Sequence, residues 1–363
     1  MSDQHAEWGF EMVPVLCESC DWRYLAPEDG LPSVCPHCAS SKLVTLSSEE
    51  ARFPYSTPPE LLVPFSVSEG EIQRRIEEFA SGIPFPPPDL SAPALLERLQ
   101  RIFLPMWLVD SDVGASWRAE VGFDYEVVSH QERYADGIGW RTEEVKERRT
   151  RWEPRKGRLV RHYDNAAAPA LEQHALLQRV LGSHKPGSAV PYRADLVRGA
   201  TIRAPDLAPE DAWADAQLAL RQRALEECRQ AARADHIRDF DWEPEYTRRH
   251  WTLLLLPVYS TVYLDDEEEP QRVMINGQTG QLHGSRRGSM KRAGRVSLTI
   301  GIIAAVLFLL SVALALFGSL FPPLVAVGLV GALIALALGV GAAVPVIQVT
   351  VFNRREQRTS LQV

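Results

Sequence analysis

The chain has 363 residues, 45% of them hydrophobic, which is enough for a folded core and more than one module. Its 39 Lys and Arg against 47 Asp and Glu give a net charge of -8, which excludes a chain that binds polyanions over its whole surface. The polar start, residues 1–9, has no apolar stretch of the signal-peptide type. We therefore expect the region that follows to stay in the cytoplasm.

The strongest motif is a pair of Cys-x-x-Cys sequences, Cys17-Glu18-Ser19-Cys20 and Cys35-Pro36-His37-Cys38. Two such pairs can place four thiolates tetrahedrally around zinc, and four thiolates leave no open position for substrate. We therefore predict a structural zinc site with Cys17, Cys20, Cys35 and Cys38 as ligands. Two disulfides are the alternative, which a reducing cytoplasm disfavours. His37 could replace a ligand, but an exposed loop histidine is the preferred interpretation.

Residues 1–50 are predicted to form a zinc ribbon, with Trp22–Leu25 and Lys42–Val44 as strands. Asp21 and Ala39 follow the two knuckles, at positions where glycine often relieves backbone strain. Zinc ribbons often bind nucleic acid, but this segment contains nine acidic residues and only two basic ones, Arg23 and Lys42. Such a surface repels phosphates, so nucleic acid is not the expected partner and contact with protein is preferred.

Residues 51–102 are expected to hold proline-rich linkers and short helices. Ser68 and Glu71 form a capping box that predicts a helix ending at Gly82. A second helix is expected over Ala94–Ile102.

Residues 103–285 are predicted to be an α+β domain in which helices pack on an antiparallel sheet. Alternation of apolar and polar residues predicts strands around Val121–Val127, Trp140–Trp152, Arg158–Tyr163, Trp251–Leu264 and Arg272–Ile275. Asp136-Gly137, Lys156-Gly157 and Asn276-Gly277 are the expected turns. A helix is expected over Pro209–Ala234, with Cys228 as a small buried hydrophobic residue. The acidic stretch Asp265–Glu269 could bind a divalent cation, but a solvated hairpin tip is the preferred interpretation.

Residues 286–363 are predicted to form a membrane hairpin with basic flanks. No charged residue occurs from Val296 to Phe352, and each of the two segments, about 296–321 and 324–352, exceeds the ~20 apolar residues that cross a bilayer. The turn is set by Pro322 and Pro323. Lys and Arg before and after the spans predict that both termini are cytoplasmic. Two buried core helices are the alternative, and Pro345 is expected to kink the second helix.

Small residues four apart in the second predicted span form a ridge: Gly331, Ala335, Gly339 and Ala343. Such a ridge lets another helix backbone approach closely in lipid. The partner is expected to be the first span, where Ser311, Ala315 and Ser319 repeat the interval, and packing between copies in a homo-oligomer is the alternative.

An ordered set of motifs resembles a family of bacterial zinc-ribbon membrane proteins. The set comprises the two Cys-x-x-Cys pairs, Val63-Pro64-Phe65 before a capped helix, Leu104-Pro105-Met106-Trp107 with Asp110 and Asp112, and Leu255-Leu256-Pro257-Val258-Tyr259 leading to Asn276-Gly277-Gln278-Thr279-Gly280. The resemblance implies a membrane-anchored partner protein, and some of these relatives are associated with flotillin-like (SPFH) and phage-shock components that respond to envelope stress. The family offers no active-site residues to carry over.

No phosphate-binding loop, Gly-x-Ser-x-Gly or His-Glu-x-x-His motif occurs in the sequence, so no catalytic or cofactor-binding residues are assigned and a non-enzymatic role is expected. The leading hypothesis is a scaffold or adaptor at the cytoplasmic face of the bacterial inner membrane, with the lipid bilayer and a protein as partners. A membrane-tethered nucleic-acid-binding protein is the alternative. An enzyme with an unrecognised site is a third hypothesis.

Overall fold

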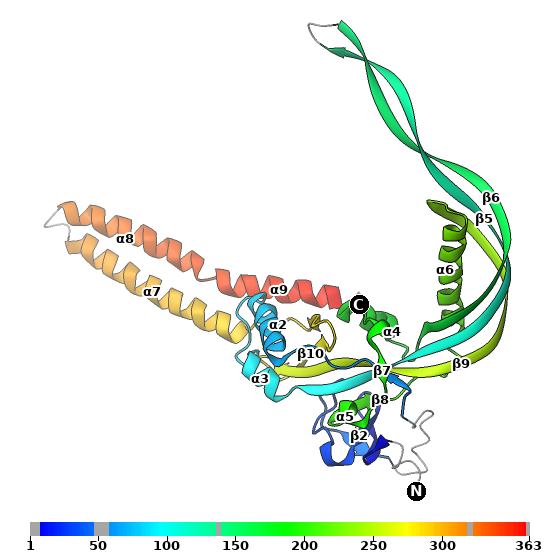
Figure 1. Cartoon of the computed structure of the whole chain (residues 1–363). Coiled ribbons are helices and arrows are strands. Elements are labelled where there is room, and N and C mark those ends of the chain that lie inside the picture. Colours follow the sequence, from blue (N-terminus) through cyan, green and yellow to red (C-terminus); the bar gives the residue numbers. More distant parts are fainter. Residues whose placement is uncertain (1–7, 47–57, 136–138, 318–321, 361–363) are drawn as a thin grey trace. The chain divides into compact units, whose positions relative to one another are not determined.

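The chain divides into two compact units in the computed structural model, which describes residues 8–46, 58–135, 139–317 and 322–360 (Figure 1). Unit 1 consists of Met1–Pro105, Gln173–Ala204 and Leu255–Val363, and unit 2 of Met106–Glu172 and Pro205–Leu254. Two long strands, β5 (Gln100–Ala135) and β9 (His236–Leu264), each pass from one unit to the other.

The ribbon is part of the sheet of unit 1. It consists of β1 (Met12–Cys17), β2 (Arg23–Pro27) and β3 (Leu43–Thr45), with β1 antiparallel to both neighbours. β2 pairs antiparallel with β8 (Ala200–Arg203), which runs parallel to β5. On the other side of β9 lie β10 (Pro270–Asn276) and β11 (Leu282–Gly284), both antiparallel. The cysteine cluster and the mixed sheet with helices confirm the predicted fold class.

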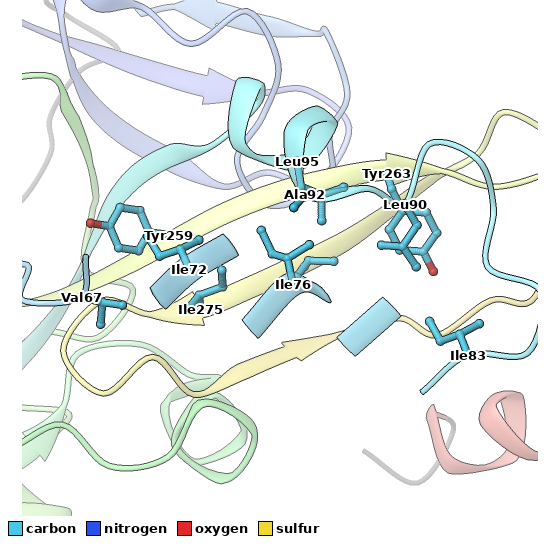
Figure 2. Packing of buried hydrophobic residues seen from close by; sticks show 11 residues of the cluster. Val67, Ile72, Ile76, Ile83, Leu90, Ala92, Leu95, Tyr259, Tyr263 and Ile275 are labelled. Carbon is cyan, nitrogen blue, oxygen red and sulfur yellow. The ribbon is translucent and has the colours of Figure 1, made fainter. Parts of the chain in front are cut away.

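Helices α2 (Glu69–Ser81) and α3 (Ala92–Glu97) pack with β9 and β10 in a hydrophobic core cluster of unit 1. Figure 2 shows Ile72 and Ile76 of α2 beside Tyr259 and Ile275 of the sheet. The backbone N–H of Glu71 donates to Ser68 Oγ at 3.3 Å and Gly82 is the C-cap, so the predicted capping signals are confirmed. The second predicted helix is partly wrong, because α3 ends at Glu97 and Gln100–Ile102 already belong to β5.

The remaining short elements of unit 1 connect these parts. They are β4 (Leu61–Leu62), α4 (His174–Leu181), β7 (Val190–Pro191), α5 (Ala194–Val197), and the 3-10 turns Glu28–Gly30 and Pro186–Ser188. β4 pairs with β7 and with β9.

Unit 2 is built on a long antiparallel pair, β5 and β6 (Gly139–Pro169), which stay in register except for a bulge between Val109 and Ser111. The predicted turn at Lys156-Gly157 is wrong, because both residues lie within β6 and Gly157 pairs with Trp117. A Cβ on Gly157 would lie only 3.0 Å from Trp117 Nε1. This glycine therefore makes room for an indole ring and does not turn the chain. Gly137 lies outside the described residues.

Helix α6 (Trp213–Ala231) packs in unit 2 through residues four apart: Ala216, Leu220, Ala224 and Cys228. The predicted burial of Cys228 is confirmed, with 2% of its surface exposed. Leu218 is 65% exposed because it lies off this ridge.

The Asn276–Gly280 loop is held by a buried asparagine. Asn276 Oδ1 accepts the backbone N–H groups of Gln278 and Thr279, and its Nδ2 donates to the carbonyl of Leu181 at 3.1 Å. A Cβ on Gly277 would lie 2.7 Å from the Phe65 ring, and Gly280 has a φ of +73°. Each of these three positions therefore has a structural reason for its residue type.

Two helices of unit 1 are long and apolar enough to span a membrane, Met290–Phe317 and Pro323–Gln357, and only 11% of each apolar window is buried. This exposure disfavours the alternative of buried core helices. The first helix is α7 (Met290–Phe317), whereas the second is divided into α8 (Pro322–Gly341) and α9 (Val344–Ser360). Pro345 lacks the N–H that would continue α8, which explains the predicted interruption. Residues 318–321, the predicted end of the first span, lie outside the described residues.

The small residues pack α8 against α7 within one chain. A Cβ on Gly328 would lie 2.7 Å from the carbonyl oxygen of Ser311 and 2.8 Å from Ala315 Cβ, and one on Gly331 would meet Ser311 Oγ. The expected packing against the first span is confirmed for Gly331 and Ser311. A Cβ on Gly339 would have no neighbour within 4 Å, so only part of the ridge packs against α7.

Candidate metal centre

The two cysteine pairs lie at matching knuckles of the ribbon. Cys17 ends β1, and the N–H of Asp21 donates to the Cys17 carbonyl at 2.8 Å; in the second knuckle, the N–H of Ala39 donates to the Cys35 carbonyl at 2.9 Å. Asp21 and Ala39 have φ values of 57° and 61°, which are costly for residues other than glycine. The expected strain after each knuckle is therefore present.

Pairing of the strands brings the four thiols together. The four sulfur atoms lie within 4.8 Å of one another, with Cys17 Sγ 3.6 Å from Cys38 Sγ and Cys20 Sγ 3.7 Å from Cys35 Sγ. A tetrahedron of thiolates with Zn–S bonds of about 2.3 Å has edges of about 3.8 Å. The described cysteines form no disulfide. These four residues could hold a metal ion, and their donor type and spacing fit zinc.

Buried aromatic residues shield the cluster. Cys17 and Cys35 are buried, and Tyr24, which is fully buried, has its hydroxyl 3.5 Å from Cys35 Sγ. Burial raises the pKa of Tyr24, so the hydroxyl stays protonated and can donate to this sulfur. The backbone N–H of His37 donates to the same sulfur at 3.4 Å. Both donors would stabilise a metal-bound thiolate.

His37 is neither a ligand in the cluster nor an exposed loop residue. Its ring is half-buried and stacks on Trp22 with centroids 3.7 Å apart. Burial, together with the positive charges of Arg272 and Arg203, lowers the pKa of His37 to about 3. The imidazole is therefore neutral at physiological pH and acts as a packing surface beside the knuckle.

Two arginines from distant parts of the chain surround the ribbon core. Arg203 of β8 is 3% exposed, lies over the Trp22 ring at 4.5 Å, and donates to the carbonyls of Arg23 and Ala204. Arg272 of β10 donates from Nη1 to the carbonyl of His37 at 3.3 Å. Zinc with four thiolates carries a charge of 2−, which two guanidinium groups would balance.

No sequence signal marks Arg203, and Arg272 is expected from the sequence only as the start of a strand. Neither residue belongs to a local motif, since they lie far from the cysteines in sequence. Only the pairing of β2 with β8, and of β9 with β10, brings them to the ribbon.

Two carboxylates of the acidic turn accept hydrogen bonds from other groups of the protein. Asp265 Oδ1 accepts the N–H groups of Glu267 and Glu269, and Asp266 accepts the Ser289 hydroxyl and the N–H of Lys291 at the start of α7. These contacts favour the hairpin tip over the cation site.

Comparison with protein families, curated proteins and solved structures finds no match for the chain.

Proposed function

We propose that the protein is a non-enzymatic, membrane-anchored zinc-ribbon scaffold or adaptor that recruits protein partners at the cytoplasmic face of the bacterial inner membrane. The observation that carries this proposal is that unit 1 combines a closed cluster of four cysteines with two exposed apolar helices. Four thiolates would fill the coordination sphere of zinc, so the metal would hold the ribbon together and would not act on a substrate.

Contacts at the base of the hairpin support the proposal that both termini lie on the same side of the membrane. Gly288, just before α7, exchanges two hydrogen bonds with the Asn353 side chain in α9, at 2.8 and 3.0 Å. The two ends of the hairpin therefore lie together and would face the same side of a bilayer. Basic residues flank both ends, which favours the cytoplasmic side. The family resemblance extends the proposal to assemblies with SPFH or phage-shock components.

The test compares zinc content and partner recovery in membrane particles that keep the native lipid. Wild-type protein should contain one zinc ion per chain and co-purify with a defined protein. The variant Cys17→Ser/Cys20→Ser should lose both the metal and the partner, because two ligands are missing. Cys228→Ala is the matched control, since this thiol lies in unit 2 and outside the cluster.

An unchanged set of co-purifying proteins in the Cys17→Ser/Cys20→Ser variant would refute the ribbon as a docking module. Recovery of nucleic acid that wild type holds in a salt-sensitive manner and the variant loses would instead favour the nucleic-acid-binding alternative.

A further inference from the structure

Helix α9 continues the second span, after a short break, along the base of α7. After the break at Ala342–Ala343, α9 runs antiparallel to α7, with Asn353 opposite Gly288 and Thr350 Oγ1 3.8 Å from Met290 Sδ. Val349 on this side is fully buried, and Phe352 packs on the core cluster under α2. One face of α9 is thus fixed to unit 1.

The other face of α9 is apolar and exposed, and it leads directly to arginines. Val344, Ile347 and Val351 are 46%, 56% and 43% exposed, and they are three or four residues apart, on one side of the helix. Arg354 and Arg355 follow one turn later and are exposed. Soluble helices seldom present such a stripe to water, whereas a helix at a lipid interface does.

A further arginine comes from α7. The antiparallel register that places Met290 beside Thr350 carries Arg295 to the level at which α9 begins, and Arg295 is exposed. The uncharged run starts at the next residue, Val296. From Val344 to Arg354 the helix rises by about 15 Å, whereas the headgroup layer of one leaflet is about 5–8 Å thick. Arg295 therefore lies at one end of the apolar stripe and Arg354 at the other, too far apart to contact one phosphate.

The carboxylate of Asp266 is hydrogen-bonded at the start of α7. Asp266 accepts hydrogen bonds from Ser289 and from the backbone of Lys291. Glu356 is half-buried and lies near His283.

We propose that this surface binds anionic phospholipid, with the headgroup phosphate held by Arg354 and Arg355 and the acyl chains against Val344, Ile347 and Val351. The proposal rests on the proposed function, because it requires the hairpin to lie in a bilayer. Cationic side chains alone would also attract a soluble phosphate or a nucleic acid. The apolar stripe beside them distinguishes a lipid from either, because only a lipid offers both an anionic group and hydrocarbon.

The experiment measures lipid preference in the full chain. Purified protein in nanodiscs is equilibrated with vesicles of equal parts phosphatidylglycerol and phosphatidylcholine, and the lipids that remain bound are counted by native mass spectrometry. Wild type should retain phosphatidylglycerol preferentially. Each arginine near a membrane surface changes such a preference by about fivefold, so Arg354→Gln/Arg355→Gln should reduce it by about 25-fold.

Two further variants identify the cause. The variant Arg149→Gln/Arg155→Gln/Arg158→Gln removes three exposed arginines from β6 and should keep the preference. The variant Ile347→Ser/Val351→Ser keeps the arginines and should weaken retention of both lipids, because the acyl contact is lost. Inorganic phosphate should not compete with the bound lipid.

Equal retention of the two lipids by wild type would overturn the proposal, as would an equal loss in the β6 variant or displacement of the lipid by inorganic phosphate. Extraction of membranes with alkaline carbonate distinguishes failure of the lipid-site proposal from failure of the proposed membrane anchoring. Wild type that remains in the membrane pellet but shows no lipid preference refutes only the lipid site. Wild type that is released refutes the membrane anchor itself.

Discussion

Arg272 should determine how tightly the ribbon holds its metal. Its guanidinium donates to the carbonyl of His37, which lies between Cys35 and Cys38 in the sequence. Of the two arginines beside the ribbon, Arg203 and Arg272, it is the nearer in sequence to the acidic turn. In Arg272→Met the aliphatic part of the side chain is largely kept, while the positive charge and the hydrogen bond are removed. The zinc–thiolate cluster would then keep an uncompensated negative charge in a partly buried environment.

The size of the effect can be estimated in two ways. A hydrogen bond from a charged group contributes about 1.5–3 kcal/mol. Loss of a partner that contacts a metal ligand or its immediate surroundings costs about 10–100-fold in metal affinity, which is about 1.4–2.7 kcal/mol. The two ranges agree, so we expect Arg272→Met to bind zinc about 10–100-fold more weakly than wild type.

The assay is competition for zinc between the purified full chain and a chromophoric chelator of known affinity, followed by the absorbance of the chelator. Cobalt substitution provides a second measurement, because tetrahedral cobalt thiolate sites absorb visible light. Arg286→Met is the matched control, since Arg286 is a half-buried arginine of the same unit that lies over Phe79 at 5.5 Å. Unchanged affinity in Arg272→Met, or an equal loss in Arg286→Met, would refute the reasoning.

Three further predictions concern the rest of the chain. Burial raises the pKa of Cys228 to about 11, so this thiol should resist alkylation at pH 7 until the protein is denatured; rapid labelling of native protein by mass spectrometry would contradict this. The hydrogen bond from Arg98 lowers the pKa of Asp89, so its stabilising effect is present above about pH 4 and is lost as the pH falls through the folded-state pKa. Asp89→Asn should therefore lower the midpoint of thermal unfolding at pH 7, and the difference from wild type should shrink below about pH 4; a constant difference at all pH values would be inconsistent with this linkage. In the hairpin, Gly328→Leu should separate α8 from α7 and lower the free energy of unfolding in detergent by a few kcal/mol. Gly339→Leu should be tolerated, because a Cβ at this position meets no neighbour. Equal effects of the two glycine substitutions would argue against this packing of α8 on α7.

The sequence by itself predicted the features that depend on local chemistry. Four cysteines at knuckle spacing predicted the cluster because the ligands of each knuckle are neighbours along the chain. Ser68 and Gly82 predicted both ends of α2, since capping satisfies backbone groups within one turn. The uncharged run after Arg295 predicted apolar helices because length and composition alone decide whether a segment can cross a bilayer.

Only the tertiary structure decided the features that depend on distant residues. Gly157 reads as a turn residue, but it lies in a strand because Trp117 of the partner strand occupies the space of a side chain. Gln100–Ile102 read as the end of a helix, but Arg101 and Ile102 pair with β8 and become strand. Sheet pairing likewise brings Arg272 to the ribbon. Local patterns cannot report such partners, because each of these residues takes its role from side chains and strands that are far away in sequence.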